Sequence, residues 1–79
     1  MIATPLTDLD WGQRATIVRL EGGFGLQRKL RSRGVREGKM VTLLTGHPLR
    51  GPLVISIGGR QTAIGRGMAS RIIVEVREQ

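Results

Sequence analysis

The stretch LRSRGVREGKMVTL, residues 30–43, decides how this chain folds. Good helix formers precede it, and Leu26 and Leu30 stand four positions apart, a spacing that puts both on one face of a helix. Gly34 stands where a helix commonly ends in a left-handed residue, and the arginines around it suit the negative end of the helix dipole. We therefore expect a helix over about residues 24–33, with both leucines facing the core and the arginines facing water.

Gly38 supplies the turn that leads from this helix into a strand of alternating residues. Over the whole chain, twelve glycines and three prolines separate short runs rich in β-branched residues, which is typical of strands. Gly58-Gly59 favours a tight hairpin between two of these runs. With a second short helical turn before the last of them, strands are expected at residues 13–20, 40–45, 53–57, 61–64 and 72–76.

About five short strands with one inserted helix predict a mainly β fold, a small antiparallel barrel. A closed or nearly closed sheet leaves few exposed edges and encloses one core. A chain of 79 residues suffices for one domain, expected over residues 1–79, and such a chain buries about 60–65% of the surface of its unfolded form. Because a deep cleft would use apolar residues that the core needs, this size favours a module that binds through its surface.

The chain contains no cysteine, which excludes a disulfide scaffold, a thiolate metal site and a cysteine nucleophile. Small secreted domains usually need disulfides, so their absence favours a reducing compartment. The first residues do not form a signal peptide, and no apolar run approaches the roughly 20 residues that a membrane span requires. The composition therefore predicts a cytoplasmic protein that does not insert into a membrane.

Residues with catalytic or metal-binding potential are sparse. The single histidine, His47, lies in a Gly-His-Pro turn, and Asp8 and Asp10 lie near the N-terminus. A metal site needs two or three converging ligands, and a hydroxyl nucleophile needs a base. Glycine-rich turns such as Gly65-x-Gly67 lack the strand–turn–helix unit of a nucleotide site. We expect no catalytic residue, no cofactor and no metal ligand set, leaving open weak divalent metal binding between protomers.

Positive charge is the strongest compositional signal, with thirteen Lys and Arg against six Asp and Glu and a net charge of +7. Nearly half of it lies in one cluster around the predicted helix, formed by Arg28, Lys29, Arg31, Arg33, Arg36 and Lys39. This cluster fits a solvated helix face, a surface that docks on an acidic protein, or a phosphate-binding surface. Single-strand binding proteins interleave basic residues with stacking aromatics, whereas this chain has only two aromatic residues.

Those two aromatic residues are Trp11 and Phe24. Trp11 is expected in the core or as a lid over one end of the barrel. The alternative is an exposed binding anchor, a role in which tryptophan is enriched.

The stretch over residues 30–43 resembles the signature of the FeoA family: a leucine late in a helix, a capping glycine, an aliphatic residue, a second glycine and an alternating strand. The resemblance covers roughly residues 4–76. Its further matching pieces are Pro5-Leu6-Thr7-Asp8-Leu9, Gly12, Ile17, Gly22-Gly23, Pro52-Val54-Ile55 and Ala69-x-x-Ile72-x-Val74.

The resemblance implies an SH3-like barrel that serves as a cytoplasmic accessory of ferrous iron uptake. It implies a protein partner, a FeoB-type membrane transporter with a GTP-binding domain on its cytoplasmic side. We expect docking through the barrel rim and the basic cluster. Two alternatives remain open: a basic barrel that binds nucleic acid, and a metal-sensing regulatory module of the kind fused to metal-dependent repressors. A homodimer is also open, as is the direction in which the partner is regulated.

Overall fold

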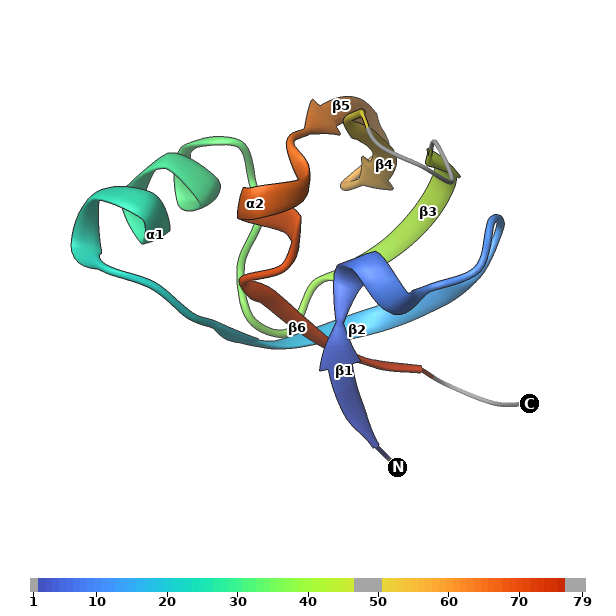
Figure 1. Cartoon of the computed structure of the whole chain (residues 1–79), viewed down its shortest axis with the longest axis horizontal. Helices are drawn as coiled ribbons and strands as arrows, with labels where there is room; N and C mark the ends of the chain where they lie inside the picture. The colour runs from blue at the N-terminus through green and yellow to red at the C-terminus, as the bar shows by residue number, and fades with distance from the viewer. Residues whose placement is uncertain (1, 47–50, 77–79) are drawn as a thin grey trace.

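The computed structural model describes residues 2–46 and 51–76, which form one antiparallel sheet and three short helices (Figure 1). In chain order the elements are β1 (Ala3–Pro5), the 3-10 helix η1 (Leu6–Asp8), β2 (Arg14–Leu20), α1 (Phe24–Ser32), β3 (Met40–Gly46), β4 (Leu53–Ile57), β5 (Arg60–Ile64), α2 (Arg66–Ala69) and β6 (Ile72–Val76).

The sheet has the order β1-β6-β2-β3-β4-β5, and every neighbouring pair is antiparallel. All five expected strands are present, and the structure adds a sixth. The missed strand, β1, has three residues and contains Pro5, too short a run to show alternation. Its pairing partner β6 lies at the other end of the sequence, which places β1 at one edge of the sheet and β5 at the other.

Two irregularities bend the middle of this sheet. The register of β2 against β6 shifts between Ile17 and Arg19, and that of β3 against β4 shifts between Leu43 and Thr45. Such bulges bend a strand and increase its twist. The sheet curls accordingly, with β6 and β2 crossing below α2 and the β4–β5 hairpin above it (Figure 1). The small, mainly β barrel is thus confirmed, as an open and strongly curled sheet.

Aliphatic side chains fill the interior of the curl. Leu30 of α1 is completely buried, and Leu26 is half-buried against the same cluster. In β4, Leu53, Ile55 and Ile57 are buried while the residues between them are half-buried, the alternation expected of a strand with one face on the core. No charged or polar residue is buried in the described part of the chain.

The expected core or lid position of Trp11 is wrong, because this side chain is 65% exposed. It lies in a tight turn that is tied down on both sides. Gln13 N donates to Asp10 O at 3.0 Å, and Gly12 N donates to Leu43 O at 2.6 Å. The aliphatic side chains already fill the core, so the turn carries Trp11 outward.

The end of α1 is a six-residue hydrogen-bonded loop. The backbone N–H of Val35 donates to Leu30 O at 3.0 Å, and that of Gly34 donates to Arg31 O at 3.0 Å. This pair of bonds is the Schellman motif, which requires a left-handed residue at the position of Gly34, and Gly34 has φ of +85°. Leu30 and Val35 are both fully buried, so the motif closes over the core. The helix ends at Ser32, one residue before the expected boundary.

The turn after α1 is fastened to β2 and to α1. Gly38, with φ of +89°, donates its N–H to Ile17 O at 2.7 Å. Arg31 Nη1 and Nη2 contact Glu37 Oε1 and Oε2, each at 3.0 Å, in a two-pronged ion pair. The hydrogen bond from Arg31 lowers the pKa of Glu37 below its ordinary value.

Leu30→Ala tests whether α1 is anchored in the core. Because Leu30 is fully buried, its truncation should lower the free energy of unfolding by about 2–5 kcal/mol. Denaturant unfolding measures the loss. Arg28→Ala on the exposed side of the same helix is the control, with an expected change within about 0.5 kcal/mol. A loss at Leu30 no larger than at Arg28 would contradict the orientation of the helix.

Gly34→Ala and Gly25→Ala should change stability in opposite directions. A Cβ at either position meets nothing within 4 Å, so the backbone alone decides. At Gly34 alanine must adopt positive φ, which costs about 1–2 kcal/mol. Gly25 is within α1 and has ordinary φ, so alanine there should stabilise by about 0.5 kcal/mol. Thermal unfolding of the two variants compares them directly, and shifts of equal sign would refute the motif.

The Arg31–Glu37 pair should be visible in a titration. In Arg31→Gln the pKa of Glu37, followed by NMR of its carboxyl carbon, should rise toward its ordinary value because the guanidinium that favours the carboxylate is gone. A lowered folded-state pKa contributes stability above the unfolded-state pKa. The difference in stability between wild type and variant should therefore be present at neutral pH and vanish as the pH falls through the folded-state pKa of Glu37. An unmoved pKa would show that the pair does not form in solution.

Candidate functional site

A shallow groove lies between the end of α1 and the β4–β5 hairpin. It consists of two adjoining hollows of about 170 and 220 Å³, which share Arg33, Ile57 and Arg60 in their walls. One hollow continues along β5 and the other along the turn after α1. We name this site the basic groove; its remaining walls are formed by Ser32, Gly34, Arg36, Lys39, Gly58, Gln61 and Thr62.

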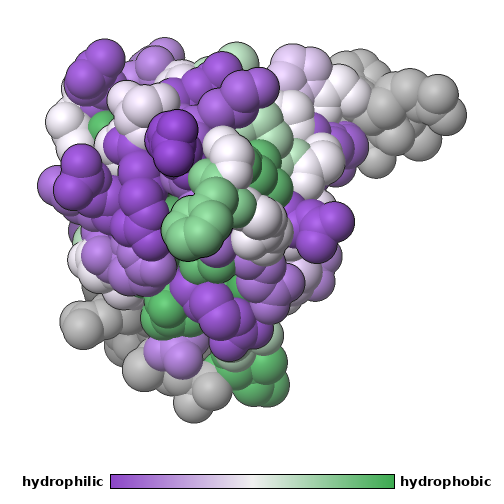
Figure 2. Space-filling model, turned by 90° about the vertical axis from the view of Figure 1, so that its left-hand side faces the viewer, coloured by the Kyte–Doolittle hydropathy of each residue, from purple (hydrophilic) through white to green (hydrophobic). Residues whose placement is uncertain are grey.

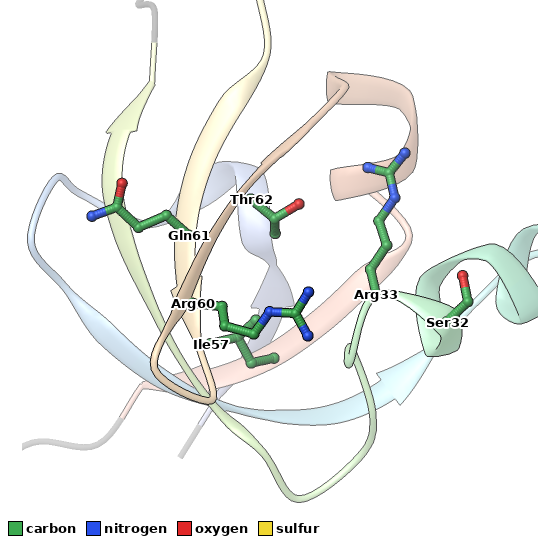
Figure 3. A pocket seen from close by; sticks show the side chains of 6 residues that line it. All are labelled: Ser32, Arg33, Ile57, Arg60, Gln61 and Thr62. Carbon is green, nitrogen blue, oxygen red and sulfur yellow. The ribbon is translucent and has the colours of Figure 1, made fainter.

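The side chains of β5 reach the basic groove because of strand alternation. Arg60, Thr62 and Ile64 share one face of the strand; Ile64 is buried, Thr62 is half-buried and Arg60 is exposed. In Figure 3, Arg60 and Thr62 point toward the end of α1, whereas Gln61 points the other way. The face of β5 that is buried at Ile64 is therefore exposed at Arg60, and the Arg60 side chain forms part of the groove wall.

Arg33 approaches the groove from the opposite side and is held in place. Its Nη1 donates a hydrogen bond to the carbonyl of Ala63 in β5 at 3.0 Å. This bond uses one N–H of a guanidinium that has several, so the remaining N–H groups stay available for another acceptor. Figure 3 shows the side chain extending from the end of α1 alongside β5. Arg33 therefore both joins α1 to the sheet edge and contributes charge to the groove.

Arg36 and Lys39 reach the groove together because one turn holds them. Lys39 N donates to Arg36 O at 3.2 Å, and Gly38 at the third position of this turn has positive φ, as a type II turn requires. The two residues at the ends of the turn both line the second hollow.

The six basic residues predicted from the sequence therefore separate into groups. Arg33, Arg36 and Lys39 line the basic groove. Arg31 is paired with Glu37. Arg28 and Lys29 are exposed on α1 and are absent from the groove walls. Figure 2 looks at the molecule from the side on which α1 lies in Figure 1, and this side is predominantly hydrophilic.

Arg60 is the groove residue that sequence reasoning missed. It follows the Gly58-Gly59 turn as an ordinary first residue of a strand, more than twenty positions after the basic cluster. No local pattern distinguishes it. Only the position of β5 as the edge strand beside α1 makes it a neighbour of Arg33.

The groove suits anions. Four cationic residues line the second hollow, namely Arg33, Arg36, Lys39 and Arg60, and none of the described wall residues is acidic. Ile57, 5% exposed, is the apolar part of the wall. Hollows of this size are below the roughly 300–1,000 Å³ of small-molecule pockets, so the shape favours contact with part of a larger partner.

A metal site finds no support among the described residues. No group of three or more His, Cys, Asp or Glu side chains converges within residues 2–46 and 51–76. Asp8 accepts a hydrogen bond from Thr4 Oγ1 at 2.9 Å, and Asp10 is exposed. His47 lies outside the described residues. Neither α-helix of the described part is long and apolar enough to span a membrane.

Comparisons with known proteins agree with the resemblance seen in the sequence. The family model of the FeoA domain matches residues 4–76. A Methanocaldococcus jannaschii protein named as an Fe(2+) transport protein A is 32% identical over 74 residues, 94% of this chain and 88% of that protein. A Porphyromonas gingivalis Fe(2+) transport protein A/Fe(2+) transporter FeoB fusion protein is 32% identical over 71 residues, 90% of this chain and 8% of the fusion.

A solved structure extends the agreement to three dimensions. The crystal structure of an iron uptake regulatory protein, FeoA, superposes with a TM-score of 0.88 at 32% identity, covering 98% of this chain and all of that one. The predicted SH3-like fold is thereby confirmed. Because the family model matches residues 4–76 and a relative is 32% identical over 94% of this chain, this chain belongs to the FeoA family.

Proposed function

We propose that this chain is a cytoplasmic, non-catalytic accessory protein of ferrous iron uptake that docks on the GTP-binding domain of a FeoB-type transporter. The observation that carries the proposal is the fusion protein, in which a segment like this chain is part of the same polypeptide as a transporter named FeoB. Fusion raises the effective concentration of two modules that bind one another. A separate chain with the same fold has to find the transporter by affinity alone.

The basic groove is the surface we propose for this contact. It concentrates cationic side chains on a rigid frame: Arg33 is bonded to β5, and one turn holds Arg36 and Lys39. Complementary charge speeds association and selects the partner. The proposed partner surface is therefore acidic, and a shallow groove is sufficient for such a contact.

Iron enters this proposal as the cargo of the transporter, with no cofactor assigned to the chain itself. Nucleic-acid binding and metal sensing remain predictions from charge and from the resemblance. Neither gains support from the groove, whose described walls carry no aromatic side chain and no carboxylate.

Binding of the purified chain to the cytoplasmic domain of the transporter tests the proposal. We expect association at low salt that weakens as ionic strength rises, measured by calorimetry or pulldown. Arg36→Glu/Lys39→Glu should weaken binding by at least about tenfold, because like charges then face each other. Arg28→Glu/Lys29→Glu makes the same change of charge on α1 outside the groove walls and should cost much less.

Two results would count against the proposal. Lack of association between two folded partners at low salt would remove the docking function. Equal loss in both double variants would leave docking intact and show that net charge, not the groove, governs it.

A further inference from the structure

The open backbone of β5 offers a second kind of recognition beside the charges. Gly58 and Gly59 have φ of +60° and +78°, and the pair Ile57–Arg60 flanks them, so the β4–β5 connection is a two-residue type I′ hairpin. The pair that flanks such a turn exchanges both hydrogen bonds, and pairs then alternate along the ladder. Gln61 pairs with Ser56, and Ala63 pairs with Val54. Both are pairs without mutual hydrogen bonds, so Gln61 and Ala63 direct their N–H and C=O groups away from β4.

The bond from Arg33 supports this orientation and divides the edge. Arg33 Nη1 reaches the carbonyl of Ala63 from outside the sheet at 3.0 Å, as an outward carbonyl requires. The far half of β5 is thus occupied by a side chain of the chain itself. The near half, around Gln61, stays open, and it is this half that borders the basic groove.

We propose that this half of β5, together with the basic groove, binds an extended acidic polypeptide segment as an added strand with carboxylates at alternate positions. Main-chain bonds to an exposed edge supply the affinity in this mode, and side-chain sites at every second residue supply specificity. Side chains on one face of a strand repeat at about 6.8 Å, so alternate carboxylates would all face the cations. The proposed function supplies the identity of the partner, and the inference rests on it only for that.

A polypeptide fits these features better than a phosphate polymer. Pairing with an outward N–H and C=O requires a second backbone, which nucleic acid lacks. The described groove walls have no aromatic residue on which a base could stack. The apolar side chain of Ile57 next to the cations suits a segment that mixes acidic with aliphatic residues.

A second copy of this chain is a poorer occupant of the same edge. Pairing of β5 with β5 would bring two clusters of Arg33, Arg36, Lys39 and Arg60 together, and like charges across an interface are strongly unfavourable. The cations also protect the edge from such pairing, a common role of charged residues on edge strands. If the cations only protected the edge, acidic peptides with different spacings of their carboxylates would bind equally well. An added strand instead predicts a preference for one spacing, and peptide affinities can measure this preference.

The test is an NMR titration of the full chain with two synthetic peptides of equal composition. In one, four glutamates alternate with valine and threonine; in the other, the glutamates form one block. We expect the alternating peptide to bind at least about tenfold more tightly. Its resonance shifts should concentrate at Arg60–Ala63 and in the turn over residues 33–39. Equal affinity of the two peptides would overturn the proposal.

Two variations separate charge from backbone pairing. Arg60→Ala should lower the affinity for the alternating peptide by about tenfold. Arg14→Ala on β2 is the control, because Arg14 is exposed and lies outside the groove. N-methylation of every second peptide residue removes N–H donors without altering the protein. Two such peptides are needed, one methylated at the odd positions and one at the even positions, because only one of the two sets faces β5. Methylation of that set should abolish the preference for the alternating peptide. Unchanged binding of both methylated peptides would exclude an added strand.

Competition with a short oligonucleotide at the same salt decides between ligand classes. Tighter oligonucleotide binding at the same residues would assign the groove to phosphate and overturn the proposal. The outcome is independent of the transporter. Peptide binding without transporter association would reject only the proposed function. Transporter association together with equal affinity for the two peptides would reject only the added strand.

Discussion

The six-residue hydrogen-bonded loop from Leu30 to Val35 is the constraint on which the rest of the structure depends. It ends α1, reverses the chain and buries an aliphatic side chain at each of its ends. The bonds can form only if the residue between them adopts positive φ, which glycine does without steric cost. Every later element takes its position from this reversal, because β3 starts only a few residues beyond it. The loop also sets the positions of the groove residues Arg33, Arg36 and Lys39, because they lie within it or directly after it.

The elements that the sequence predicts well are those whose signal is local. Alternation identifies β4, and a glycine after helix formers identifies the end of α1, each within a window of a few residues. β1 escapes because its three residues are a strand only through pairing with β6. Trp11 is misplaced for a similar reason: whether a core has room for an indole depends on side chains from the whole sheet.

The candidate site divides in the same way. Sequence reasoning finds the positive charge near α1, because it is contiguous, but cannot say which charges are neutralised. Arg31 has a carboxylate six residues later, Arg33 has a carbonyl thirty residues later, and neither distance in sequence is informative. Arg60 completes the groove from a strand with no basic run of its own. The site forms because the end of α1 lies beside the edge strand β5. This neighbourhood can be recognised only once the fold is known.

The pairing of the first strand with the last has a consequence for how this fold can be attached to other proteins. Ala3 lies opposite Glu75, so β1 and β6 run side by side at one edge of the sheet, while β5 forms the other edge. In Figure 1 the start of β1 and the end of β6 lie on the lower side of the molecule and β5 lies on the upper side, so a polypeptide joined at either end starts on the side away from β5. The domain can be tethered, even covalently, without a linker crossing its outward-facing edge, and one geometry serves a free-standing chain and a fused one equally well.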